Sequence, residues 1–344
     1  MIGFQAVSKR YRGGRLALDD VSLSLPAGGS LGLVGESGSG KTTCVRLALG
    51  LARPTSGRLT FNGVGYPGTR HGLRALRKQI GFVLQDPYDS LDPRMTIGDI
   101  VSEPLRIHGL PGGRGSEREA RVAEQLAAVG LADADLHSYP SRYSGGGRQR
   151  IAVARALISA PSVLICDEPT SSLDVSVQSQ IVNLLLDAAR ERELSTLFVT
   201  HDLDLIGRVV DTVAVMYGGR VVETGPAELI RRSPRHPYTK ALHDAVPADH
   251  PRHRKLVGRT VAVGAGPVVG AAGDVDAGTA QVPAAGGAEQ FGAEPSRPAL
   301  IGADHRDSCV FASRCPRAEA RCRQERPPMT AEGGGRSFAC FYPI

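Results

Sequence analysis

The stretch Gly35-Glu-Ser-Gly-Ser-Gly-Lys41-Thr42 decides the fold of this chain. It has the pattern G-x-x-x-x-G-K-[ST], in which glycines let the backbone turn tightly and direct its N–H groups at phosphate oxygens. The apolar run 31–34 ahead of it is typical of a buried strand, and residues 43–50 are expected to form a helix whose N-terminus faces the anion. A strand, a loop and a helix in this order predict a phosphate-binding loop in an α/β fold.

Two side chains of this loop have expected roles in nucleotide chemistry. Lys41 is expected to reach the β- and γ-phosphates, and the Thr42 hydroxyl is expected to ligate Mg²⁺. The other loop residues expected to bind the phosphates are Gly35, Ser37, Gly38, Gly40 and Thr43.

Composition limits the class of protein. The chain has 344 residues, 41% of them hydrophobic, which allows one large or two modest domains. Its net charge of +6 is spread along the chain without a dense basic block, so it is weak evidence for a nucleic-acid partner. No apolar run approaches the roughly 18–20 residues that span a bilayer, and the N-terminus does not resemble a signal peptide. We therefore expect a cytoplasmic protein whose six cysteines form no disulfides.

A second glycine-rich stretch precedes another helix. Ser144, Gly145 and Gly146 come just before an expected helix that starts near Arg148. A serine and glycine amides at a helix N-terminus form an anion site. Because the chain has a single phosphate loop, we expect the two sites to meet in trans, across a dimer.

Candidate catalytic residues follow buried strands. Three apolar runs are expected to form such strands: 80–84, 162–166 and 196–200. Ligands bind at the carboxyl ends of strands in open α/β sheets. There Asp167 would hold Mg²⁺, Glu168 would act as general base, Gln85 would contact Mg²⁺ or the attacking water, and His201 would donate to the γ-phosphate. Any of these could instead be an ordinary polar exit from a sheet, and only their common position favours function.

The remaining chain supports an α/β core with additions. Residues 1–30 alternate as β structure and contain Tyr11, which could stack on an adenine ring. Residues 96–139 have helical spacing, and residues 213–225 are expected to form a β-hairpin.

These motifs together carry a family resemblance. Tyr11, the phosphate loop, Gln85, Ser144–Gly146, Asp167-Glu168, Asp174 and His201, in this order, resemble an ABC transporter ATPase over about residues 1–235. The resemblance implies an α/β P-loop NTPase of ABC type, with a parallel-sheet core, an antiparallel β subdomain and a helical subdomain. It also implies that ATP and Mg²⁺ bind between one subunit's phosphate loop and the other's Ser-Gly-Gly signature, with Asp174 among the nucleotide-binding residues.

Further stretches resemble the oligopeptide/dipeptide importer branch, namely 85–97, 236–242 and the C-terminal cysteines. The resemblance implies an ATPase on the cytoplasmic face of the membrane that serves two integral-membrane permeases and, through them, an extracytoplasmic solute-binding protein. Its second ATPase would be a homologous subunit, although a homodimer stays open. Nickel, a metallophore or another small solute stays open as cargo. A soluble ABC ATPase acting on nucleic acid or ribosomes is the alternative outside transport, and we expect no nucleic acid.

The signature departs from the family pattern at its two ends. Tyr143 stands where a leucine is usual, and Gly147 stands where a glutamine is usual. This subunit's contribution to its partner's ATP site is therefore open, and the two sites of a dimer could differ.

The expected domain boundaries follow from these stretches. They are a nucleotide-binding domain at 1–235 with a helical subdomain at about 90–150, an importer-type C-terminal segment at 236–257, a flexible Gly/Ala-rich linker at 258–304, and a Cys-rich module at 305–344. The module's cysteines are Cys309, Cys315, Cys322 and Cys340. Four cysteines on a tail short of large apolar residues suggest a metal staple, although they lack C-x-x-C pairs. A [4Fe–4S] cluster, zinc and unligated thiols all stay open.

Overall fold

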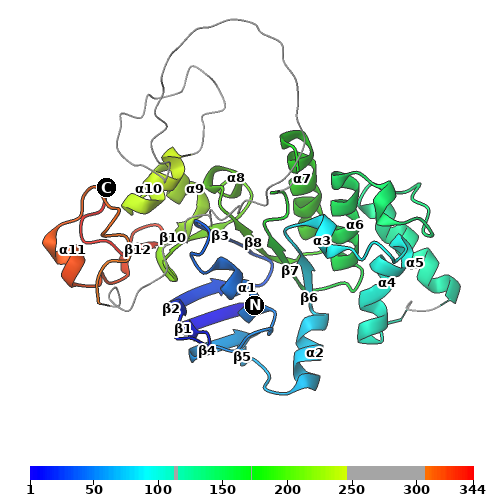
Figure 1. The fold of residues 1–344 in the computed structure, drawn as a ribbon, viewed down its shortest axis with the longest axis horizontal. Coiled ribbons are helices and arrows are strands. Elements are labelled where there is room, and N and C mark those ends of the chain that lie inside the picture. The colour runs from blue at the N-terminus through cyan, green and yellow to red at the C-terminus, as the bar shows by residue number, and fades with distance from the viewer. Residues whose placement is uncertain (112–114, 172, 246–306) are drawn as a thin grey trace, which may run out of the picture. The chain divides into compact units, whose positions relative to one another are not determined.

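The computed structural model describes residues 1–111, 115–171, 173–245 and 307–344 (Figure 1). The expected linker, 258–304, lies outside these residues, as do residues 246–257 of the expected segment 236–257. None of the helices in the described ranges is both long enough and apolar enough to cross a membrane.

The larger of two sheets carries the phosphate loop. In spatial order its strands are β11 (Thr330–Glu332), β12 (Arg336–Phe338), β10 (Arg220–Pro226), β9 (Thr212–Tyr217), β3 (Ser30–Val34), β8 (Ser195–Thr200), β7 (Val163–Asp167) and β6 (Ile80–Val83). From β9 to β6 the neighbouring strands are parallel, whereas β9, β10, β12 and β11 pair antiparallel. The parallel strands are near-continuous apolar runs because both faces of this part of the sheet are buried.

The smaller sheet is antiparallel. Its strands are β2 (Leu16–Leu25), β1 (Ile2–Arg10), β4 (Ser56–Phe61) and β5 (Val64–Gly65). Val21, Leu23 and Leu25 alternate with exposed residues and point into a core that they share with helix α1 (Lys41–Ala48) and one face of the larger sheet. A turn at Asn62-Gly63, both with positive φ, joins β4 to β5.

Most of the helices pack in the second hydrophobic core, on the other face of the larger sheet. The helices of the described chain, in addition to α1, are α2 (Arg70–Lys78), α3 (Pro87–Ser90), α4 (Ile97–His108), α5 (Gly115–Ala128), α6 (Gly145–Leu157), α7 (Val175–Glu191), α8 (Leu203–Ile206), α9 (Ala227–Arg232), α10 (Pro237–Asp244) and α11 (Ala320–Gln324). Helices α4, α5 and α6 contact one another and form the helical subdomain (Figure 1). The predicted fold class, a parallel core with an antiparallel β subdomain and a helical subdomain, is confirmed.

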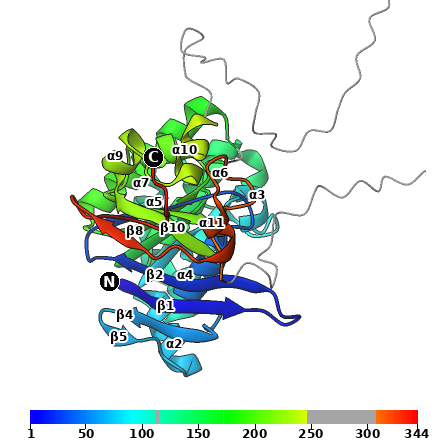
Figure 2. The same ribbon diagram turned by 90° about the vertical axis from the view of Figure 1, so that its left-hand side faces the viewer.

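Residues 307–344, called the tail from here on, differ from the expectation of an apolar-poor end that needs a metal. Strand β12 pairs with β10, at Glu223–Phe338 and Thr224–Ser337, and so extends the larger sheet (Figure 2). The tail also fills part of the second core with four buried residues: Cys309, Phe311, Ala312 and Cys322. The tail is therefore held by strand pairing and apolar packing.

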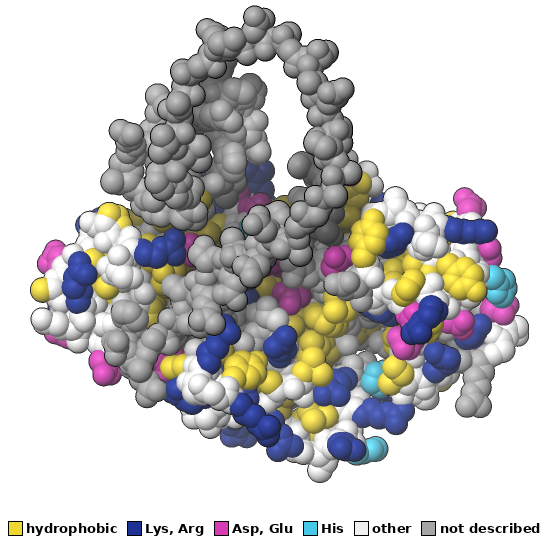
Figure 3. All heavy atoms as spheres, viewed as in Figure 1, with side chains coloured by type: hydrophobic (Ala, Val, Ile, Leu, Met, Phe, Trp, Pro, Cys, Tyr) yellow, Lys and Arg dark blue, Asp and Glu magenta, His cyan; other side chains and the backbone are white. Residues whose placement is uncertain are grey.

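Charge is less evenly distributed than the sequence suggested. Figure 3 shows Lys and Arg side chains gathered along the edge where α2 and the smaller sheet lie in Figure 1. Helix α2 alone exposes Arg70, Arg74 and Lys78.

Candidate nucleotide-binding site

The phosphate loop connects β3 to α1. Lys41 is the first residue of α1. Its ammonium donates to the backbone carbonyl oxygens of Gly35, at 2.6 Å, and Glu36, at 3.0 Å. Gly40 has a φ of 108°, and a Cβ atom on Gly35 would lie 2.2 Å from the Met216 carbonyl oxygen. Glycine is therefore required at both positions, and the loop is closed around the lysine side chain.

Three carboxylates lie around the Lys41 ammonium. Burial lowers the pKa of Lys41, and the carboxylates of Glu168, Asp167 and Glu36 oppose that effect. Burial also raises the pKa of Asp167, and the neighbouring Glu168 raises it further. The exposed Thr42 hydroxyl and the Asp167 carboxylate offer oxygen ligands, the donor set that Mg²⁺ prefers, so these residues fit the expected ion.

Three expected catalytic residues converge beyond the ends of β6, β7 and β8. Gln85 Nε2 donates to Glu168 Oε2 at 3.3 Å, and His201 Nδ1 lies 3.6 Å from the same oxygen. Glu168 has a φ of 45°, a left-handed conformation that is costly for a residue with a Cβ. Its backbone N–H donates to the Val199 carbonyl oxygen at 2.9 Å, which ties the strained residue to β8. The chain thus holds one carboxylate in a fixed place between an amide and an imidazole.

The Ser-Gly-Gly signature forms the N-terminus of α6. Ser144 is the N-cap of this helix, and its Oγ accepts a hydrogen bond from the Gly147 N–H at 3.3 Å. Gly146 packs against α7, where an added Cβ would lie 2.7 Å from a Val177 methyl carbon. The two glycines thus form the first turn of α6, the end of a helix at which anions bind.

The two departures at the ends of the signature lie close together. The Tyr143 hydroxyl lies 3.0 Å from Ser138 Oγ and the ring is partly buried against the core. A Cβ at position 147 would lie 3.2 Å from Tyr143 Cβ, closer than side chains usually pack. A side chain at 147 would therefore be tight against residue 143 whether that residue is tyrosine or leucine, because both have this Cβ.

The structure gives Tyr11 and Asp174 partners outside the phosphate loop. The Lys9 ammonium lies 5.1 Å from the centre of the Tyr11 ring, and Asp174 caps α7 by accepting from the Val177 N–H at 3.0 Å. In the part of the chain that the structure describes, no hydrogen bond or ion pair joins either residue to the phosphate loop. Their expected nucleotide contacts stay predictions.

Sequence reasoning missed Glu36, the second residue of the loop. Its backbone N–H donates to the Tyr238 hydroxyl at 2.8 Å, and its carboxylate pairs with Arg314 of the tail at 2.7 Å. Both partners lie in stretches that the sequence singled out, around 236–242 and among the cysteines, but nothing local indicates that they meet the loop.

The four tail cysteines line one small pocket. Burial raises the pKa values of Cys309, Cys315 and Cys340, the last to about 11, so these thiols are protonated near neutral pH. Within the described ranges no group of three or more His, Cys, Asp or Glu side chains has the geometry to hold a metal ion. The thiols as they stand do not fit an iron–sulfur cluster.

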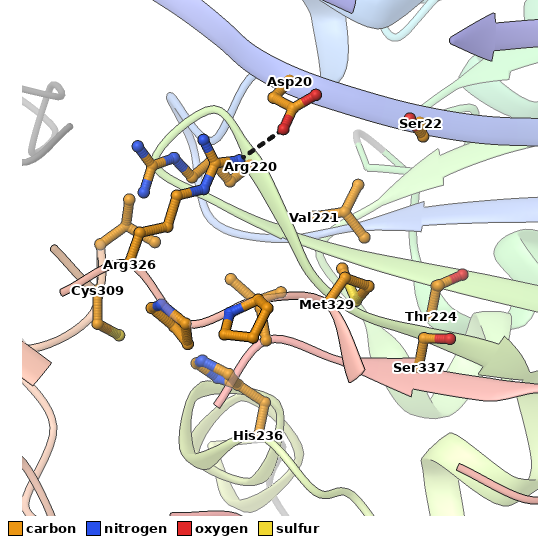
Figure 4. Close-up of a pocket in the computed structure, with 15 residues that line it drawn as sticks. Asp20, Ser22, Arg220, Val221, Thr224, His236, Cys309, Arg326, Met329 and Ser337 are labelled. Atoms are coloured by element: carbon orange, nitrogen blue, oxygen red, sulfur yellow. Dashed lines mark hydrogen bonds and ion pairs between the residues drawn. The ribbon is translucent and has the colours of Figure 1, made fainter. Parts of the chain in front are cut away.

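A wider pocket beside the tail offers no second charged site. Arg326 Nη2 lies 3.2 Å from the Asp20 carboxylate (Figure 4). Arg220 Nη2 lies 2.6 Å from the carboxylate of Asp19. The lining of this pocket is otherwise largely apolar, with Val221, Met329 and two prolines among its residues. Its arginine charges are thus balanced by neighbouring carboxylates.

Comparison with known proteins places the chain in a family. A model of the ABC transporter family matches residues 18–171, and one of the oligopeptide/dipeptide transporter C-terminal region matches residues 222–267. The chain is 39% identical over 325 residues to a probable peptide ABC transporter ATP-binding protein, y4tS, of Sinorhizobium fredii, covering 94% of this chain and 82% of that protein. It is 48% identical over 240 residues to the glutathione import ATP-binding protein GsiA of Escherichia coli K12, covering 70% of this chain and 38% of the GsiA length.

Solved structures agree. CbiO1 from Clostridium perfringens, part of an ABC transporter complex, matches with a TM-score of 0.61 at 31% identity over 67% of this chain and 89% of its own. The cassette MJ0796, a dimer bound to ADP and Pi, matches with a TM-score of 0.60 at 30% identity over 66% of this chain and 99% of its own. The chain therefore belongs to the ATP-binding subunits of ABC transporters, which are ATPases, and within them to the oligopeptide/dipeptide branch.

Proposed function

We propose that this ABC ATPase hydrolyses ATP to drive the import of oligopeptides or dipeptides through a membrane permease. The observation that carries the proposal is the Glu168 carboxylate, which lies within 3.3 Å of Gln85 Nε2 and 3.6 Å of His201 Nδ1, near the buried Lys41. Such a cluster can activate a water beside a bound triphosphate.

The phosphate loop binds the nucleotide. Lys41 and the loop amides hold the β- and γ-phosphates, and Thr42 and Asp167 supply oxygen ligands to Mg²⁺. When bound, Mg²⁺ neutralises charge on the phosphates. The position of Asp167 at the carboxyl end of β7 supports this assignment, because ligands bind at the carboxyl ends of strands in open α/β sheets.

Glu168 is the general base of the reaction. It accepts a proton from the attacking water, Gln85 orients that water, and the His201 imidazole donates to the γ-phosphate. The strained backbone of Glu168 supports this role, because such strain clusters at functional sites.

The second half of each site comes from a partner ATPase. Ser144, Gly145 and Gly146 contact the nucleotide of the partner, while Tyr11 stacks on the adenine and Asp174 lies at the closed interface. Closure of the two subunits on ATP, and their separation after hydrolysis, moves the two permeases. The partner is a homologous subunit or a second copy of this chain, and the altered signature makes unequal ATP sites part of the proposal.

Peptide cargo is supported by the C-terminal region match and by the names of the relatives, a peptide transporter and a glutathione importer. Nickel, a metallophore or another small solute is the alternative for the same machine. The proposed location is the cytoplasmic face of the membrane, with a solute-binding protein acting outside.

The test is affinity purification from gently solubilised native membranes, with mass spectrometry of the associated proteins. The proposal predicts two polytopic permeases, a second ATPase and a solute-binding protein whose ligands identify the cargo. Recovery in the soluble fraction alone, with RNA or ribosomal proteins, would contradict it.

The [4Fe–4S] cluster stays a separate prediction. The shared pocket of the four thiols supports it, whereas their arrangement is not that of a metal site within the described residues. Iron and acid-labile sulfide, measured on protein purified without oxygen, decide it. Zinc in place of iron identifies a structural zinc site. If the protein contains neither iron nor zinc, the four thiols are unligated.

A further inference from the structure

An ion pair joins the tail to the phosphate loop. The Arg314 guanidinium donates to both oxygens of the Glu36 carboxylate, from Nη1 at 2.7 Å and from Nη2 at 3.0 Å. Two parallel hydrogen bonds of this kind make the most specific form of an arginine–carboxylate pair. The residues are 278 positions apart, so the pair forms only when the tail packs on the core.

Arg314 is held in place by aromatic side chains. Its Nη1 also donates to the Tyr217 hydroxyl at 3.3 Å, and its guanidinium carbon lies 5.6 Å from the Tyr217 ring centre and 5.9 Å from that of Phe311. Phe311 is 3% exposed and its ring centre lies 5.4 Å from that of Tyr238. The hydrogen bond to Glu36 raises the pKa of Arg314, which stays charged at any pH the protein meets.

The backbone of Glu36 is fixed as well. Its N–H donates to the Tyr238 hydroxyl, at 2.8 Å, and its carbonyl oxygen accepts from Lys41 at 3.0 Å. The start of the loop is thus positioned by α10, by the tail and by the lysine that binds phosphate.

A free carboxylate at this position would oppose ATP binding. Glu36 follows the first glycine of the loop and contributes to the electrostatic environment of Lys41. Unpaired, its charge would repel a bound polyphosphate, whereas the pair with Arg314 is neutral. We propose that Arg314 is a positioning residue of the ATP site, which neutralises Glu36 and fixes the start of the phosphate loop. The inference rests on ATP binding at this loop, as proposed above.

The test measures nucleotide affinity of the full-length chain by competition with a fluorescent ATP analogue. For Arg314→Gln, we expect about tenfold weaker MgATP binding, equal to about 1.4 kcal/mol, a smaller loss for MgADP and little change for AMP. This order follows because repulsion by Glu36 grows with phosphate charge. Arg323→Gln, which removes the same charge from an exposed position of the tail, should bind like the wild type.

Two more variants separate charge from folding. Adding Glu36→Gln to Arg314→Gln should restore most of the MgATP affinity, and Arg314→Lys should restore part of it, because lysine keeps the charge but not both hydrogen bonds. An equal loss for all three nucleotides, or no recovery in the double variant, overturns the inference. If the wild type binds MgATP and Arg314→Gln binds it equally well, only this inference fails. If the wild type binds no MgATP, the proposed function fails with it.

Discussion

The phosphate loop and the tail meet in this structure, yet the sequence reveals them very differently. The loop is a local pattern: the strand, the glycines, Lys41 and the helix follow one another within 20 residues of sequence, Ser30 to Leu49. The tail has no comparable pattern, and its place depends on partners far away in the chain, such as β10 for β12 and Glu36 for Arg314. Local patterns can therefore identify the site that binds a ligand and still miss the parts of the chain that hold it in shape.

The first prediction tests whether the locally encoded cluster performs the chemistry. Glu168→Gln should lower the ATP hydrolysis rate by about 10²–10⁴-fold, because the amide cannot take a proton from water, while MgATP binding is retained. Single-turnover hydrolysis and nucleotide binding measure the two effects.

A matched control is Glu193→Gln, since Glu193 is an exposed glutamate that also has a positive φ, of 50°. It should hydrolyse ATP at the normal rate. Comparable activity of Glu168→Gln and the wild type would show that another group is the base.

The second prediction tests whether the tail is part of the core. Phe311→Ala should lower the free energy of unfolding by about 3–5 kcal/mol, because it empties an aromatic site among Tyr217, Tyr238 and His236. Chemical denaturation measures the loss. Phe341→Ala, in the same tail but only partly buried, should cost clearly less. Equal small losses for both would mean that the tail does not share the core.

The third prediction concerns the altered signature. Gly147→Gln should destabilise the chain by about 1–3 kcal/mol, because the new Cβ lies 3.2 Å from Tyr143 Cβ. Tyr143→Leu combined with Gly147→Gln keeps this Cβ and should recover little of that loss in thermal unfolding. If the single variant is as stable as the wild type, the contact does not constrain position 147.

The smallest expected effect is a pH dependence at the contact between core and tail. Burial lowers the pKa of His236 from 6.5 to about 3 in the folded chain, so the folded state favours the neutral imidazole. Stability from this residue is complete above pH 6.5 and is lost as pH falls below it, by at most about 1.4 kcal/mol per pH unit. His236→Asn keeps an acceptor for the Tyr238 N–H but does not titrate, so its unfolding free energy should fall less between pH 6.5 and 5.5. Parallel pH curves for both proteins would contradict this.

Much of the fold could be predicted because its elements show periodic apolar patterns and are bounded by turn and capping residues. The strands from β3 to β8, the hairpin β9–β10 and the capped helix α6 all follow patterns that are complete within a few residues. The convergence of Gln85, Glu168 and His201 was predictable as well, because each follows a parallel strand of one sheet.

The remainder depends on contacts that no local pattern encodes. The strained φ of Glu168 arises from its fit beside β8, and the pair of Glu36 with Arg314 needs the tail to fold back on the loop. The tail's cysteines drew attention as metal ligands, yet two of them, Cys309 and Cys322, pack as small apolar residues in the core. Thiols have both uses, and sequence spacing does not distinguish them.

Hydrogen–deuterium exchange of the full-length chain, with and without MgATP, most directly tests whether the tail belongs to the ATP site. Without nucleotide, amides around β12 should already exchange slowly, because they pair with β10. MgATP should then slow exchange both in the loop 35–42 and in residues 309–315 around Arg314. Protection of the loop alone, with the tail exchanging as freely as an unpaired chain, would contradict the account.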